Sequence, residues 1–470
     1  MGTRVNTNLL LISFDQWRGD WSDPNAPTLP LPALFNLART GWYAKRCYTS
    51  SPHCVPARMS WLTGLAPSQL GITCNADVSL PADAPSLIRD LRHQGWHTAV
   101  VGKTHWTSHF QKVDLRENTL LLNQLGFDKS CEVAGPRALR RVSCELTEAW
   151  RQAGFLEKQR ADLKRRYGAG RSRSAWCVRP TLLPNPLYPD IWIAEQGLKA
   201  LQEMPHEQPW LLWISFVGPH EPFDTPQPWH GMHKSNQLPL AKAKSEWIAT
   251  LPESCELKQC ARSWNGLLTS ADIKACRADY ADHMRLLDDQ LGLLLSGLQN
   301  REDHPRTAVL ATSDHGELLG DGGMLYKANF LEGAIRVPFV YKPPQQSSKA
   351  EGGQSNRPLS LTGLFQQVLT NLPAGGALKP LKQWARRQPG AVVEFGSERL
   401  YIHGPLKLCV DAKGQPLWAT HIGKDPDEQR NQLTNSPGQS PRWNRLQAWA
   451  DEEQERRSSK VWVWRRLTDA

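Results

Sequence analysis

The run Leu9-Leu10-Leu11-Ile12-Ser13-Phe14-Asp15, close to the start of the chain, indicates the fold more clearly than any other stretch. It is apolar apart from Ser13 and ends in a carboxylate. An apolar run without alternation predicts a strand buried on both faces, as in a parallel sheet covered by helices. It is far shorter than the roughly 20 residues of a membrane-spanning helix. We therefore expect a buried strand that presents Asp15 at its carboxyl end.

Similar runs recur along the chain and alternate with amphipathic stretches. The strand-like runs are Leu9–Phe14, Thr98–Val101, Trp210–Val217, Ala308–Thr312 and Val337–Tyr341, and the helical stretches are Ala82–Gln94, Ile191–Glu203 and Ile273–Leu298. This alternation predicts an α/β fold with a large, mixed, mostly parallel central sheet flanked by helices. Residues 157–180, residues 230–270 and the Gln/Ser/Gly-rich segment Gln345–Asn356 are expected to be loops or insertions.

The character of the sequence changes after about residue 375. Short strand-like pieces at Ala391–Phe395, Leu400–Ile402, Lys407–Val410 and Pro416–Thr420 predict a small antiparallel sheet, and Pro441–Arg457 looks helical. We predict a large domain of residues 1–375 and a C-terminal α+β subdomain of residues 376–470.

Composition narrows the function only in part. The 470 residues include 56 Lys+Arg and 46 Asp+Glu, so the formal net charge is +10, which favours anionic partners without choosing among them. Ten cysteines without a C-x-x-C pair are too few for a disulfide scaffold and do not suggest a zinc site. We recognise neither a signal peptide nor a spanning segment, so the prediction is a soluble cytoplasmic protein without membrane partners.

Polar and ionisable side chains follow the predicted strands at the point where each ends. They are Asp15, Lys103, His105, His220, Asp314 and His315. In an open α/β sheet the ligand crevice lies outside the carboxyl ends of the strands. The sequence therefore predicts a site at this edge of the sheet.

The segment Ser51-Pro52-His53-Cys54-Val55-Pro56-Ala57-Arg58, followed by Leu62-Thr63-Gly64, contains the pattern C-x-P-x-R and then L-T-G. It resembles the signature of the type I sulfatases of the alkaline phosphatase-like superfamily. The resemblance implies that Cys54 is oxidised by a formylglycine-generating maturation enzyme to formylglycine (3-oxoalanine), whose hydrate is the nucleophile. Val55 is bulkier than the small residue often found there.

Further segments match the family in the same order. They are Asp15-Gln16-Trp17-Arg18-Gly19-Asp20, Gly102-Lys103-Thr104-His105-Trp106, Pro219-His220-Glu221-Pro222-Phe223, Thr312-Ser313-Asp314-His315-Gly316-Glu317, the pattern Lys327, Glu332, Arg336-Val337-Pro338, and Asp425-Pro426-Asp427-Glu428 with Asn431. The first of these most resembles the branch that contains choline sulfatases and phosphonate monoester hydrolases.

The resemblance also implies a metal site and roles for its neighbours. The implied ligands are Asp15, Gln16, the oxygen formed at Cys54, Asp314 and His315, a set that suits Ca²⁺ and leaves Mg²⁺ or Mn²⁺ open. Gln16 is the weakest of them, since an amide is a poorer ligand than a carboxylate.

Arg58, Lys103 and Lys327 would surround the sulfate oxygens. Asp314 would accept the proton of the attacking hydroxyl, His105 would deprotonate the second hydroxyl, and His220 with Lys327 would protonate the leaving alkoxide. Substrate contacts are expected from Asn75 and Trp106, and Tyr188 and Asp190 are placed near the pocket.

These residues predict a sulfatase acting on a small sulfated substrate. A phosphonate monoester or phosphodiester hydrolase using the same site is the first alternative. The second is a non-catalytic anion-binding or nucleic-acid-binding protein, but no helix-turn-helix, zinc-finger or RNP-like pattern supports it, so we expect no nucleic acid partner. The sequence does not choose an oligomeric state.

Overall fold

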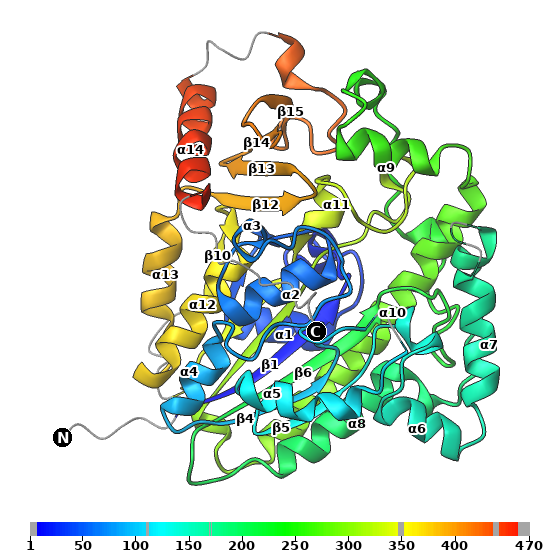
Figure 1. The fold of residues 1–470 in the computed structure, drawn as a ribbon, viewed down its shortest axis with the longest axis vertical. Helices are drawn as coiled ribbons and strands as arrows, with labels where there is room; N and C mark the ends of the chain where they lie inside the picture. The colour runs from blue at the N-terminus through cyan, green and yellow to red at the C-terminus, as the bar shows by residue number, and fades with distance from the viewer. Residues whose placement is uncertain are drawn as a thin grey trace, which may run out of the picture.

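A computed structural model describes residues 7–109, 112–168, 170, 172–345, 352–435 and 441–458. Its centre is an eight-stranded sheet in the order β10-β2-β9-β7-β1-β6-β4-β5 (Figure 1). The strands, in chain order, are β1 Asn8–Asp15, β2 Trp42–Ala44, β4 His97–Gly102, β5 Lys129–Glu132, β6 Trp210–Pro219, β7 Thr307–Ser313, β9 Phe339–Lys342 and β10 Gly353–Ser355.

β1 lies in the middle of this sheet and pairs in parallel with β6 on one side and β7 on the other. β4 and β5 continue the parallel arrangement, whereas β9 runs antiparallel to both β7 and β2. The predicted mixed, mostly parallel sheet is therefore confirmed. The run Val337–Tyr341 is not one strand, because it is divided at Pro338 between β8 (Arg336–Val337) and β9.

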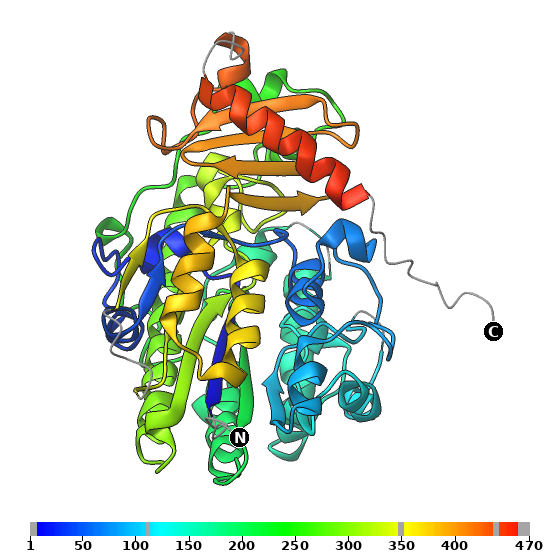
Figure 2. The same cartoon turned by 90° about the vertical axis from the view of Figure 1, so that its left-hand side faces the viewer.

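Alternate residues of β1 supply the cores of the two helical layers. Leu10, Ile12 and Phe14 belong to the hydrophobic cluster that contains α1 (Pro32–Thr40), α8 (Pro189–Gln202) and α10 (Ser270–Gln299). Leu9 and Leu11 belong to the opposite cluster, with α2 (Cys54–Thr63), α4 (Leu87–His93), α12 (Leu361–Asn371) and α13 (Leu378–Arg387). Figure 2 shows helices on both faces of the sheet. The uniform apolarity of β1 thus reflects burial on both faces.

A four-stranded antiparallel sheet of β12 Ala391–Phe395, β13 Glu398–His403, β14 Leu406–Val410 and β15 Pro416–His421 forms the upper part of the molecule (Figure 1). One of its faces is covered by α14 (Pro441–Ser458), and the other joins the larger core through residues such as Val393 and Trp418. The predicted domain boundary at residues 375–376 falls between α12 and α13. Because α13 packs in the core of the large sheet, the structure does not establish this boundary, which stays a prediction.

Several predicted loops contain regular structure. The remaining strands, β3 Cys47–Tyr48 and β11 Leu359–Ser360, form a small sheet with β8 in the order β11-β3-β8. The remaining helices include α3 Pro67–Leu70, α5 Thr119–Gln124, α6 Glu145–Gln152, α7 Leu156–Tyr167, α9 Glu256–Trp264 and α11 Glu332–Ile335. The helices α7 and α9 lie in the two longer stretches that we expected to be loops. β10 lies in the connector Gln345–Asn356, of which residues 346–351 are outside the described residues.

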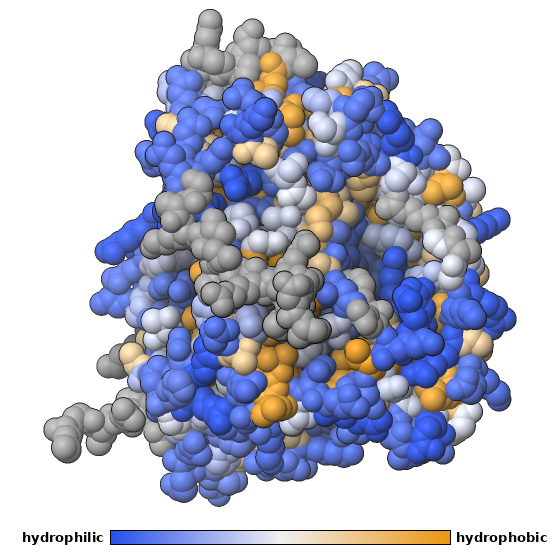
Figure 3. Space-filling model, viewed as in Figure 1, coloured by the Kyte–Doolittle hydropathy of each residue, from blue (hydrophilic) through white to orange (hydrophobic). Residues whose placement is uncertain are grey.

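The helix predicted over Ala82–Gln94 is shorter than expected. It begins at Leu87, after Pro85, and the side chain of Ser86 caps it by accepting a hydrogen bond from the backbone N–H of Arg89. Over the part of the chain that the structure describes, no helix is both long enough and apolar enough to span a bilayer. The face seen in Figure 3 is mostly hydrophilic, with small separate apolar patches.

Candidate active site

The carboxyl ends of β1, β4, β6 and β7 bring the predicted polar residues together. Asp15 ends β1, Lys103 and His105 follow β4, His220 follows β6, and Asp314 and His315 follow β7. All six side chains are buried, with at most 7% of any residue exposed. Neighbouring parallel strands place residues that are far apart in the sequence at one edge of the sheet.

Cys54 is the first residue of α2, and its side chain points into this group. Its Sγ atom lies 3.0 Å from Lys327 Nζ and 3.1 Å from His315 Nε2. Burial and the Asp15 carboxylate favour the neutral thiol, but Lys103, Lys327 and His315 together outweigh them and lower the pKa of Cys54 to about 7. The site therefore favours negative charge at this position.

Arg58 lies about one turn further along α2 and is 1% exposed. Its Nε donates to Asp314 Oδ2 at 2.7 Å, and its Nη1 donates to Ser215 Oγ at 2.8 Å and to the Lys103 carbonyl at 2.7 Å. Its Nη2 finds no hydrogen-bond acceptor among the described residues, although Asp15 Oδ2 lies 3.9 Å away. Arg58 is thus held rigidly, and its Nη2 amino group is left for a ligand.

Asp15, Cys54, Asp314 and His315 each offer one donor atom, and these four atoms lie within 4.8 Å of one another. Two carboxylate oxygens, an imidazole nitrogen and the atom at position 54 form a donor set that fits a divalent cation. Gln16 extends this set, with its Oε1 accepting a hydrogen bond from Lys327 Nζ at 2.8 Å. Gln16 has a left-handed φ of 71°, which is a strained conformation for any residue other than glycine. Such strained residues occur often at functional sites.

Lys103 and His105 flank Cys54 on the side of β4. Lys103 Nζ forms an ion pair with Asp15 Oδ2, and the pKa of Asp15 lies well below its ordinary value because Lys103 and other cations outweigh its burial. Burial, followed by the charges of Lys103 and His109, lowers the pKa of His105 well below its usual range. His105 is therefore neutral near pH 7 and able to accept a proton.

His220 follows β6, and its Nδ1 donates to the Glu221 carbonyl at 2.8 Å, which leaves Nε2 to accept a proton. Burial lowers the pKa of His220 to about 3. Asp190 Oδ1 holds the end of β6 by accepting from the N–H groups of Val217 and Gly218 at 2.9 and 3.0 Å. Its Oδ2 lies 2.8 Å from His283 Nε2.

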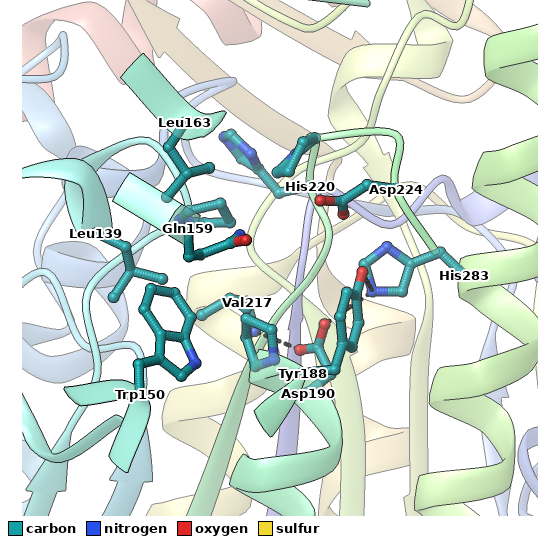
Figure 4. Close-up of a pocket in the computed structure, with 13 residues that line it drawn as sticks. Leu139, Trp150, Gln159, Leu163, Tyr188, Asp190, Val217, His220, Asp224 and His283 are labelled. Carbon is teal, nitrogen blue, oxygen red and sulfur yellow. Dashed lines mark hydrogen bonds and ion pairs between the residues drawn. The ribbon is translucent and has the colours of Figure 1, made fainter. Parts of the chain in front are cut away.

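Figure 4 shows His220, Asp190, His283 and Tyr188 around a small cavity. Tyr188 and Asp190 line that cavity and not the pocket that contains Cys54.

The two residues predicted to contact substrate lie in different surroundings. Asn75 lines the pocket beside Cys54, and its Oδ1 accepts from the Val55 N–H at 3.0 Å. Trp106 is 1% exposed, stacks on Phe127 and donates its indole N–H to the Arg58 carbonyl at 3.0 Å. The expectation that Trp106 contacts substrate is therefore wrong, because its indole is used inside the core.

Two features of the site were not predicted. Glu221 and Glu317 both accept from Gln16 Nε2, so they fix the amide whose carbonyl faces Lys327. Arg137, Arg140 and Arg141 also line the pocket, whereas the cations expected around the sulfate were Arg58, Lys103 and Lys327. The close spacing of these three arginines after Gly135-Pro136 was the available signal.

Comparison with known proteins agrees with this geometry. A sequence profile of the sulfatase family matches residues 7–373. The arylsulfatase of Clostridium perfringens is 27% identical over 461 residues, covering 92% of this chain and 91% of that protein. The choline-sulfatase of Rhizobium meliloti is 25% identical over 469 residues, covering 92% and 85%.

The crystal structure of a phosphonate monoester hydrolase of Agrobacterium radiobacter has the same fold, with a TM-score of 0.74, 22% identity and coverage of 97% of this chain and 96% of that one. The chain therefore belongs to the sulfatase family and is a hydrolase that acts on sulfuric esters.

Proposed function

We propose that this protein hydrolyses a sulfate monoester by means of a formylglycine that a maturation enzyme forms from Cys54. The observation that carries the proposal is the placement of Cys54 Sγ within 3.1 Å of both Lys327 Nζ and His315 Nε2, beside the buried carboxylate of Asp15. The hydrated aldehyde would supply a hydroxyl nucleophile at this point.

The cations around Cys54 support binding of a sulfate group. Arg58 lies on the helix that begins with Cys54, whereas Lys103 and Lys327 come from two other segments. Arg58 Nη2, which has no hydrogen-bond partner among the described residues, is available to a sulfuryl oxygen. Because the site is buried, these charges act in a low dielectric and need little reorganisation. Hydrolysis would depend mainly on such positioning and charge compensation, as in phosphoryl transfer.

The histidines and Lys327 divide the proton transfers. His105 is neutral and accepts the proton from the group at position 54. Burial acts to lower the pKa of Lys327, but the negative charges of Cys54 and Asp15 outweigh it and raise this pKa above its ordinary value. Lys327 therefore holds a proton for the departing alkoxide, and His220 Nε2 helps to relay that proton. Burial acts to raise the pKa of Asp314, but the charge of Arg58 outweighs it, so this pKa lies below its ordinary value. Asp314 is therefore better suited to bind a metal ion than to accept a proton.

Asp15, Asp314 and His315 would hold a divalent cation together with Gln16 and the oxygen at position 54. The donor set favours Ca²⁺, with Mg²⁺ or Mn²⁺ as the other candidates. A bound cation would polarise the sulfuryl group. The chain's own contribution is to keep the two carboxylates ionised and aligned, which Arg58 and Lys103 do by direct contact.

The test is the mass of the peptide that contains Cys54, together with sulfate release from 4-nitrophenyl sulfate. We expect formylglycine in the protein from its native host, and a loss of at least a thousandfold in kcat/KM for Cys54→Ala. Cys177→Ala is the matched control, because Cys177 is exposed. An unmodified thiol in fully active protein would overturn the proposed nucleophile.

The phosphonate monoester or phosphodiester hydrolase stays as a second candidate, supported by the resemblance of Asp15–Asp20 to that branch and by the shared fold. Paired kcat/KM values on phenyl sulfate and phenyl phenylphosphonate would separate the two. We propose a small sulfated substrate and the maturation enzyme as partners, without nucleic acid or membrane.

A further inference from the structure

The pocket that opens onto Cys54 has a wall of positive charge. It has a volume of about 260 Å³, and its lining residues include Cys54, Lys103, His105, Arg137, Arg140 and Arg141. Among the lining residues that the structure describes, four are Lys or Arg and none is Asp or Glu. Lys103 lies at the reacting centre, whereas the three arginines belong to one short segment, residues 137–141.

This segment is held rigidly against the site. The backbone N–H groups of Ala138 and Leu139 both donate to the Gly135 carbonyl, at 2.9 and 3.1 Å, and the Arg141 N–H donates to Ala138 O at 2.8 Å. A Cβ added at Gly135 would lie 3.2 Å from Lys103 Nζ and 3.7 Å from His105 Nε2. The arginines therefore extend from a preformed turn that touches the proposed catalytic residues.

The three arginines differ in how their charge is balanced. Arg137 forms an ion pair with the buried carboxylate of Glu221. Arg140 donates through Nη1 to a backbone carbonyl, that of Tyr167, at 2.9 Å. No carboxylate among the described residues lies within 4.0 Å of the Arg140 or Arg141 guanidinium groups.

The electrostatics agree with this difference. Burial, then the charges of Arg141 and Arg137, lower the pKa of Arg140, as expected where like charges are close together and uncompensated. Such a group is stabilised when an anion binds beside it. A cationic headgroup at the same place would meet repulsion.

We propose that the substrate of this enzyme carries a second anionic group, a carboxylate or a further sulfate, and that Arg140 and Arg141 bind it while the scissile sulfate lies at position 54. The inference rests on the proposed function and narrows its substrate class. It excludes a quaternary ammonium ester such as choline sulfate as the preferred substrate, although a choline-sulfatase is among the similar proteins.

The test compares esters that differ only in charge. One pair is 3-(sulfooxy)benzoate and 3-(sulfooxy)benzamide, and the other is choline sulfate and its uncharged isostere 3,3-dimethylbutyl sulfate. At low ionic strength we expect kcat/KM to be about five- to tenfold higher for the benzoate than for the benzamide, and lower for choline sulfate than for its isostere. Both preferences should shrink as salt is added.

The double variant Arg140→Gln/Arg141→Gln should reduce the benzoate-to-benzamide ratio to about one. Arg386→Gln, an exposed arginine on α13, is the control and should leave the ratio unchanged. If both benzene esters are cleaved with equal kcat/KM, or if choline sulfate is the better substrate of its pair, the inference is wrong and the sulfatase proposal stands. If formylglycine-bearing protein cleaves none of the four esters, both proposals are overturned.

Discussion

Replacing Lys407 with Met should destabilise the protein strongly, because Lys407 joins the C-terminal sheet to the segment that follows Lys327. Lys407 lies on β14 and is 0% exposed. Its Nζ is 2.6 Å from Glu428 Oε1, 3.2 Å from Glu332 Oε1 and 2.8 Å from the Phe330 carbonyl. One ammonium group thus neutralises two buried carboxylates.

The magnitude follows from what the substitution leaves behind. Met fills a similar volume, so little packing is lost, but Glu332 and Glu428 remain buried as a pair of like charges. Removing one partner from a buried ion pair costs about 3–5 kcal/mol in the free energy of unfolding.

One of the two carboxyl groups in the variant should take up a proton, so its pKa in the folded state rises above the unfolded value. The free energy of unfolding of the variant should then fall as the pH rises from the unfolded-state pKa of that carboxyl group to its folded-state pKa. The difference in stability between the variant and the wild-type protein should therefore be larger at pH 8 than at pH 5.

The assay is urea unfolding followed by tryptophan fluorescence, at pH 5 and pH 8. Lys413→Met is the matched control, because Lys413 is exposed in the turn between β14 and β15 and should change the free energy of unfolding by less than about 0.5 kcal/mol. Adding Glu428→Gln to Lys407→Met should recover about 1–2 kcal/mol. A loss below about 1 kcal/mol for Lys407→Met, or a double variant no more stable than the single one, would refute this reasoning.

Three further predictions concern Asp224, the metal site and Trp106. Burial raises the pKa of Asp224 to about 7, so the folded state loses stability as the pH rises from about 4 to 7. Asp224→Asn should therefore raise the free energy of unfolding at pH 8 by on the order of 2–4 kcal/mol, with little change near pH 4, in denaturation curves. Removal of divalent cations with EDTA should lower Tm and sulfatase activity, and Ca²⁺ at about 100 times its Kd should restore about 2.7 kcal/mol. Trp106→Phe removes the hydrogen bond to the Arg58 carbonyl and should cost about 1–3 kcal/mol of stability, while KM for 4-nitrophenyl sulfate changes less than about threefold.

Each of these has a clear contrary result. An equal effect of Asp224→Asn at pH 4 and pH 8 would show that its charge is not the cause. An unchanged Tm after EDTA treatment, in protein whose metal content is measured before and after, would count against the proposed cation. A large rise in KM without loss of stability in Trp106→Phe would indicate that Trp106 contacts the substrate after all.

Much of the site could be predicted because its residues come directly after buried strands. Asp15 follows an apolar run and Asp314 another, and in a parallel sheet such positions meet at one edge. The match of Cys54 and Arg58 to a family signature indicated the chemistry, since both lie on one helix and their spacing is local. Trp106 was misassigned because its neighbours in the sequence belong to the site while its own indole faces the core.

The α/β class, the buried central strand and the residues at its end follow from the amino-acid sequence, because periodicity and apolarity are properties of a few neighbouring residues. The folded chain was needed to show that β9 runs antiparallel, that Lys407 neutralises carboxylates of two other segments, and that Arg140 and Arg141 rather than the basic residues of α7 line the pocket. These facts depend on contacts between segments far apart in the chain. Such contacts are fixed by how the layers pack and by where each buried charge finds its partner, which no local pattern records.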